Sequence, residues 1–135
     1  MGEMDDTTLA AAWIVFAKRL DTAEAEHDGA GSSDSGDEYE RAGDTVLMLP
    51  YDDPDRAYAL CLEIAGRTDD PWVLGLMGAG PLETLIRADP RGVLDRLLHD
   101  VAGRPGLREA LHHVWNSNLP EDLQRQLAAL RGRTN

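Results

Sequence analysis

The stretch DPRGVLDRLLHDVAGRP, residues 89–105, has a proline near each end of one apolar helical stripe. A proline at the first helical position loses no hydrogen bond, because that N–H has no partner within the helix, and its fixed φ already suits the helix. The apolar residues between the prolines recur at the spacing of one helix face. They are Leu94, Leu97, Leu98 and Val101. The stretch therefore predicts a helix of about 11 residues that begins at Pro90 and another that begins at Pro105.

Most of the chain repeats this placement of proline. Six of the seven prolines follow a capping, glycine or turn-like residue and precede an apolar run with helical spacing. They are Pro54, Pro71, Pro81, Pro90, Pro105 and Pro120. Short helices joined by tight turns pack antiparallel. The sequence therefore predicts an all-α fold, a compact bundle or helical-hairpin stack of about six or seven short helices in a single domain over residues 1–135.

The N-terminal part predicts one long helix followed by a loop. Residues 6–25 form an amphipathic helical pattern. Residues 27–44 are rich in Gly, Ser and acids and have almost no apolar side chains, so we expect an acidic disordered loop after the first helix. Residues 45–50, TVLMLP, predict an extended segment packed against helices, since a single short strand makes no sheet. A second amphipathic helix follows from Pro54 to Gly66.

The motif GAGPLE, residues 78–83, combines two glycines with a proline. The glycines predict the end of the helix that starts at Pro71, and Pro81 predicts the start of the next one. Free N–H groups at such a start suit an anion. Glu83 follows Gly80 by three residues, as in half of a capping box, and its carboxylate would occupy the same place. We therefore interpret the motif as structural.

The chain carries a formal net charge of −12, of which −9 falls on residues 1–44 and −3 on residues 45–135. A negative surface repels nucleic-acid phosphates and anionic lipids, and it accelerates encounter with a basic partner. An acidic surface can also serve solubility alone. The charge therefore predicts no nucleic-acid or membrane partner and favours a basic protein.

The candidate binding residues are acids near the predicted loop and near two helix starts, together with one tryptophan beside them. Trp72 lies at the second position of a short helix next to two acids, whereas Trp13 and Trp115 fall on well-formed apolar stripes and are predicted to be core residues. The candidate set is Asp34, Asp37, Glu38, Glu40, Asp44, Asp52, Asp53, Asp69, Asp70 and Trp72.

No catalytic motif stands out. Cys61 is the single cysteine and lies among apolar residues, which predicts an inert core thiol. The sequence contains neither a nucleophile elbow nor a phosphate loop. An alternative is a metal-dependent or small-molecule enzyme whose cleft would contain Glu83, Asp95, His99 and His113. No cofactor or metal is predicted.

Three segments carry a resemblance to a known family. They are WVLGLMGAGPLETLI at residues 72–86, LHHVW at residues 111–115 and AAWI at residues 11–14, and GAGPLE is the distinctive part. Together they resemble DUF6869, a bacterial family of small domains of unknown function. The resemblance implies a compact helical domain without an assigned activity. Such proteins have a short link after the first helix, so the acidic residues 27–44 would be a departure from the family.

These observations predict a non-catalytic protein-protein interaction module, such as an immunity or antitoxin-like protein that binds a basic partner. An oligomeric structural or regulatory domain is a further alternative, and the sequence leaves the oligomeric state open. The chain has no secretory signal and no run of 18 apolar residues, so we expect a cytoplasmic protein.

Overall fold

The computed structural model describes residues 5–25, 38–114 and 119–131, and within these ranges all regular structure is helical. The elements are α1 (Asp6–Ala25), α2 (Glu38–Asp52), α3 (Pro54–Arg67), α4 (Pro71–Met77), the π-helical η1 (Gly78–Leu82), α5 (Glu83–Ala88), α6 (Pro90–Asp100), the 3₁₀ turn η2 (Val101–Gly103), α7 (Pro105–Leu111) and α8 (Glu121–Leu130). The prediction of an all-α fold is confirmed. If α4, η1 and α5 are counted as one continuous rod, the described α-helices form seven rods, within the predicted range.

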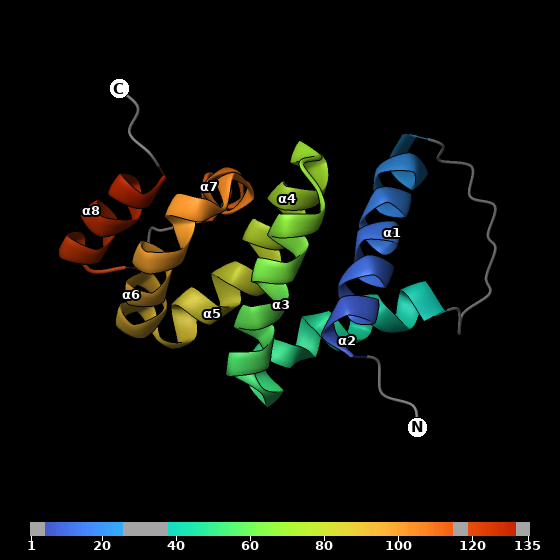
Figure 1. Cartoon of the computed structure of the whole chain (residues 1–135), viewed down its shortest axis with the longest axis horizontal. Coiled ribbons are helices and arrows are strands. Elements are labelled where there is room, and N and C mark those ends of the chain that lie inside the picture. Colours follow the sequence, from blue (N-terminus) through green and yellow to red (C-terminus); the bar gives the residue numbers. More distant parts are fainter. Residues whose placement is uncertain (1–4, 26–37, 115–118, 132–135) are drawn as a thin grey trace.

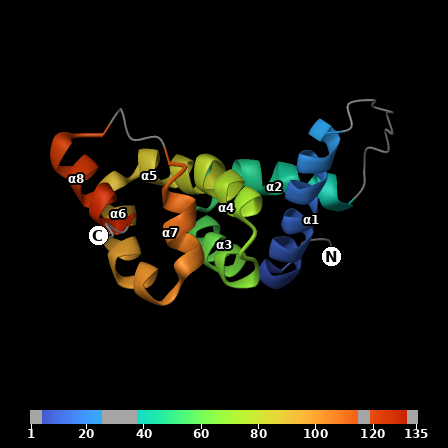
Figure 2. The same cartoon turned by 90° about the horizontal axis from the view of Figure 1, so that it is seen from above.

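The helices form an elongated stack with α1 and α2 at one end and α8 at the other (Figures 1 and 2). α1 packs against α2, α3 and α4, the rod formed by α4, η1 and α5 packs against α7, and α6 packs against α8. One continuous core of buried apolar side chains runs through the stack. Trp13 is only 3% exposed, so its predicted core position is confirmed, whereas Trp115 lies outside the described residues.

Three helices begin with the same Asp-Pro pair. In each of α3, α4 and α6 the proline occupies the first turn, and the preceding aspartate accepts a hydrogen bond from a backbone N–H that has no partner within the helix. The bonds run to Asp53 from Arg56 N (3.3 Å), to Asp70 from Trp72 N (3.0 Å) and to Asp89 from Gly92 N (3.2 Å). The predicted helix starts at Pro54, Pro71, Pro90 and Pro105 are confirmed, and α8 begins one residue after Pro120.

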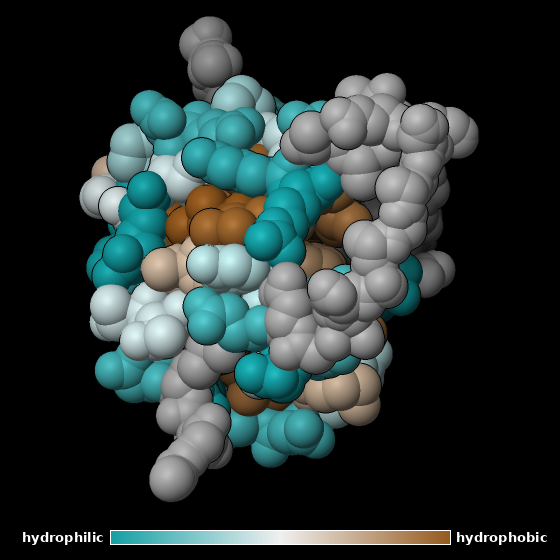
Figure 3. All heavy atoms as spheres, turned by 90° about the vertical axis from the view of Figure 1, so that its right-hand side faces the viewer, coloured by the Kyte–Doolittle hydropathy of each residue, from teal (hydrophilic) through white to brown (hydrophobic). Residues whose placement is uncertain are grey.

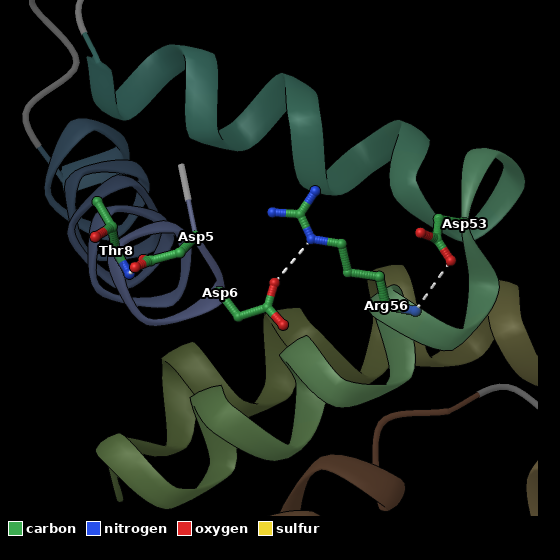
Figure 4. Close-up of polar contacts among 5 residues, drawn as sticks. All are labelled: Asp5, Asp6, Thr8, Asp53 and Arg56. Atoms are coloured by element: carbon green, nitrogen blue, oxygen red, sulfur yellow. Dashed lines mark hydrogen bonds and ion pairs between the residues drawn. The ribbon is translucent and has the colours of Figure 1, made fainter. Parts of the chain in front are cut away.

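The first turns of α1 and α3 lie side by side (Figure 4). Asp5 accepts a hydrogen bond from Thr8 N at 2.9 Å, and this bond from the backbone holds the pKa of the Asp5 carboxyl below its usual range. Asp6 pairs with Arg56, whose Nε lies 2.8 Å from the carboxylate. Both side chains of the pair are partly exposed, so the pair contributes at most about 1 kcal/mol to the contact between the two first turns.

The prediction for residues 38–50 is wrong. Residues 38–44, assigned to the acidic loop, and residues 45–50, assigned to an extended segment, all belong to α2; the rest of the predicted loop, residues 27–37, lies outside the described residues. Pro50 lies inside the last turn of α2, where it cannot donate to the carbonyl oxygen of Val46, and the helix continues only as far as Asp52. The helix forms because one of its faces is buried against α1 and α3. That face consists of Ala42, Gly43, Val46, Leu49 and Pro50.

The predicted break at residues 78–81 is also absent. The chain stays helical from Pro71 to Ala88, and Pro81 is accommodated by the π-helical turn η1. Proline cannot donate to the carbonyl four residues earlier, so the hydrogen bonds shift. The Glu83 N–H donates to the carbonyl oxygens of Gly78 and Gly80, and the Thr84 hydroxyl donates to Gly80 O at 3.1 Å. Because no helix begins at Pro81, Glu83 is not part of a capping box, and an anion has no free helix start to bind.

The two glycines of η1 have different surroundings. A Cβ on Gly78 would overlap the backbone carbonyl of Ala110 on α7, so the rod and α7 touch at backbone level. A Cβ on Gly80 would meet no atom within 4 Å. Gly78 is therefore required for packing, and Gly80 is not.

We expect Gly78→Ala to lower the free energy of unfolding by about 1–3 kcal/mol, because the added methyl group overlaps backbone that cannot rotate away. Gly80→Ala is the matched control and should raise stability by up to about 1 kcal/mol, since alanine loses less conformational entropy in a helix. Urea denaturation of both variants checks this, and equal losses would contradict the packing role of Gly78.

Candidate functional site

The predicted acids that the structure describes fall on two segments of the chain, one before α3 and one after it. Glu38, Glu40, Asp44 and Asp52 lie on α2, and Asp53 follows directly; Asp69 and Asp70 come after α3. Since α3 has 14 residues, about 20 Å of helix separates Asp53 from Asp69 and Asp70. Asp34 and Asp37 lie outside the described residues. The candidate residues therefore do not form one acidic site, and the group on α2 is the larger of the two that the structure describes.

Two of the acids and the predicted surface tryptophan have structural roles. Asp53 and Asp70 cap α3 and α4. The indole Nε1 of Trp72 donates to the backbone oxygen of Ala17 at 2.7 Å, which ties α4 to α1. Its side chain is 36% exposed but held in place by this bond. Trp72 is therefore part of the α1–α4 packing.

Large apolar side chains point outward from α2. Leu47, Met48 and Tyr51 are 67%, 49% and 69% exposed, and with Asp44 they follow the i, i+3, i+4, i+7 spacing of one helix face. We call Asp44, Leu47, Met48 and Tyr51 the α2 face. The prediction of an extended segment at residues 45–50 hides this face, although the helical spacing of these residues is present in the sequence. Contiguous exposed apolar side chains mark interaction sites more often than isolated ones do.

An apolar pocket of about 210 Å³ opens beside this face. Its walls come from α1 (Trp13 and Phe16), from α4 and η1 (Leu76 and Gly80) and from α2, which supplies Asp44 and Leu47. We call it the α1–α2 pocket. Asp44 and Leu47 belong both to the pocket and to the α2 face, so the two features are continuous. Figure 3 shows the side that α1 and one end of α2 occupy in Figure 1, where hydrophobic side chains gather among hydrophilic ones.

A larger, polar cleft of about 510 Å³ lies between the end of α3 and the start of α7. Arg67, Thr68, Asp69 and Arg104 are among its lining residues, and Arg67 already pairs with Glu63 at 2.9 Å. The cleft thus mixes both signs of charge. Asp69 shares this cleft with two arginines, so it adds little to an acidic binding surface.

The residues of the alternative enzyme cleft each have a local partner. Glu83 pairs with Arg87 at 3.2 Å, His113 approaches Glu109 at 3.4 Å, and the His99 ring contacts the backbone oxygen of Asp95 at 3.1 Å. Each of these contacts spans one helical turn. In the part of the chain that the structure describes, no three His, Cys, Asp or Glu side chains are grouped so that they could hold a metal ion.

Among the described residues, two groups with strongly shifted pKa values belong to the core. Burial raises the pKa of the Cys61 thiol to about 12, and Cys61 is 1% exposed, in agreement with the predicted core position. Burial, and then the 2.6 Å hydrogen bond that Tyr58 OH donates to Asp100, raise the pKa of Tyr58 well above its usual value. The guanidinium of Arg96 lies 5.2 Å from the centre of the Tyr58 ring. These contacts join α3 to α6.

One family model matches the chain over most of the fold. The model of the family described as "Family of unknown function (DUF6869)" matches residues 31–134, which include α2 to α8. The match begins after α1, so residues 11–14 lie outside it. No curated protein and no solved structure matches the chain. Among the described helices, none combines the length and the apolar character of a membrane span.

We expect Tyr58→Phe to lower the free energy of unfolding at about pH 8 by roughly 1.5–3 kcal/mol, because a hydrogen bond to a carboxylate is lost. The difference in unfolding free energy between the wild type and this variant should shrink above about pH 10. There the unfolded wild-type tyrosine ionises at its ordinary pKa of 10.0 while the folded one stays protonated, so the wild type alone loses this part of its stability as pH rises. Urea denaturation at about pH 8 and about pH 11 measures both. A gap that stays constant would contradict the raised pKa.

Cys61 should be inert toward a thiol-disulfide reagent in the folded protein. The thiolate is the reacting form, and at about pH 8 a buried thiol with a pKa near 12 supplies almost none of it. We expect labelling to be about 100-fold slower in buffer than in denaturing guanidinium chloride. Rapid labelling of the native protein would contradict the core assignment.

Proposed function

We propose that this chain, which belongs to the family of unknown function DUF6869, is a non-catalytic protein-binding module whose partner presents a basic surface with apolar side chains. The observation that carries the proposal is the α2 face. α2 is apolar on two sides, because Val46 and Leu49 are buried in the core while Leu47, Met48 and Tyr51 point outward. Burying an exposed apolar side chain contributes about 1.5–3 kcal/mol. The α2 face therefore offers enough apolar surface to bind a partner.

The charge around the α2 face supports a basic partner. α2 carries Glu38, Glu40, Asp44 and Asp52 against the single cation Arg41. Two copies that met through this face would bring these acids together, and each copy carries a net charge of −12. A basic surface meets the same acids favourably and is drawn to them from a distance. An immunity or antitoxin-like protein that masks a basic partner would use such a face.

Leu47 and Leu98 provide a matched pair for the test, because both leucines are exposed, at 67% and 54%, on different helices. We expect Leu47→Ser to weaken binding of the physiological partner by about 30-fold, the effect of losing an interface hot spot of about 2 kcal/mol. Leu98→Ser on α6 should leave binding unchanged. The partner is captured by cross-linking in the native host, then purified, and its Kd for each variant is measured by calorimetry.

The same titration at low and high salt tests the charge. We expect the Kd to rise with ionic strength, because the acids on α2 are exposed and their attraction is screened. If no captured protein depends on Leu47, or if the Kd is the same at both salt concentrations, the proposal fails. Light scattering that shows a dimer abolished by Leu47→Ser would instead support the oligomeric alternative and overturn the proposal.

A further inference from the structure

We infer that the α1–α2 pocket receives one aromatic or branched aliphatic side chain of the partner, and that a Lys or Arg next to that side chain pairs with Asp44. The inference rests on the proposed function and specifies the partner's contact. It follows from the size of the pocket, its lining and the position of its one charged group.

The size of the pocket selects a single side chain. At about 210 Å³ it is smaller than the roughly 300–1,000 Å³ of pockets that bury drug-sized ligands. It is larger than the apolar cavity of about 150 Å³ that is known to hold benzene. A ring or a branched aliphatic group therefore fits, and a nucleotide or cofactor does not.

The lining selects an apolar group. Trp13, Phe16 and Leu76 supply apolar walls, and Gly80 exposes a wall without a side chain. A bound water needs two to four polar partners, and this lining offers one carboxylate, that of Asp44. An apolar side chain thus replaces water there with little loss of hydrogen bonding.

Asp44 selects the charge of the neighbouring residue. Its side chain is exposed at the pocket, and it forms no ion pair with any other residue in the described ranges. Leu47, one turn further along α2, lines the pocket as well and leads onto the α2 face. A partner segment on the α2 face would therefore place a cation against Asp44 when its apolar side chain enters the pocket.

Two small probes that share a ring and differ in charge test the inference without the partner. Phenethylammonium and phenylacetate are titrated into the ¹⁵N-labelled full chain at low salt, and backbone amide shifts are followed. We expect phenethylammonium to shift the amides of Gly43, Asp44 and Gly80 and to bind about threefold more tightly than phenylacetate, the effect of one exposed ion pair. Asp44→Asn should remove this difference between the probes.

Gly80→Leu fills the pocket, since a side chain there starts in open space. We expect it to abolish binding of both probes, while Leu98→Ser leaves binding unchanged; Gly80→Ala is the smaller variant if leucine disturbs the fold, and the amide spectrum reports that directly. The inference is overturned if neither probe shifts these amides, if both bind equally to the wild type, or if the filled variant still binds.

The two proposals fail separately. If Leu47→Ser weakens partner binding but Gly80→Leu leaves the Kd of the partner unchanged, the pocket inference is wrong and the protein-binding function stands. If the probes bind as expected but no partner depends on Leu47, the proposed function is wrong.

Discussion

Residue 78 must be glycine, because the backbone of α7 lies directly against it and any larger side chain would displace that backbone. This contact fixes the rod of α4, η1 and α5 against α7 at the middle of the stack. From there the π-helical turn carries Gly80 and Pro81 toward α1 and α2, where both line the apolar pocket. Backbone contact on one side of η1 and open space on the other thus set both the core packing and the shape of the candidate site.

The sequence predicts those parts of the fold that depend on neighbouring residues. Each Asp-Pro pair combines a side-chain cap with a preset φ. The helix starts at Pro54, Pro71 and Pro90 can therefore be predicted from adjacent residues alone. The same local rules give a wrong prediction at Pro50 and Pro81, because they place proline at a helix start or a break, whereas both prolines lie inside helices. Their helices form because of burial against α1, α3 and α7, segments distant in sequence. No local pattern contains that information.

The candidate site is partly predictable by the same reasoning. The acids on α2 are visible in the sequence, but the apolar residues that make them a surface become outward-facing only when α2 is helical, because Leu47 and Leu49 then lie on opposite sides. The separation of Asp53 from Asp70 likewise follows from the length of α3. These two acids are therefore far apart although the sequence between them is short. Asp69 also lies in a cleft of mixed charge, which differs from the acidic surface of α2.

The glycine at position 80 has a consequence for engineering. A glycine in a helix where a larger residue would fit lowers the stability of that helix. The exposed leucine and tyrosine on α2 lower the solubility of the chain. A thermostability screen run on the isolated chain would discard these features first. Heat-resistant descendants obtained in that way would have a closed pocket and a polar α2 surface, so selection for stability alone would remove both features of the candidate site while preserving the fold.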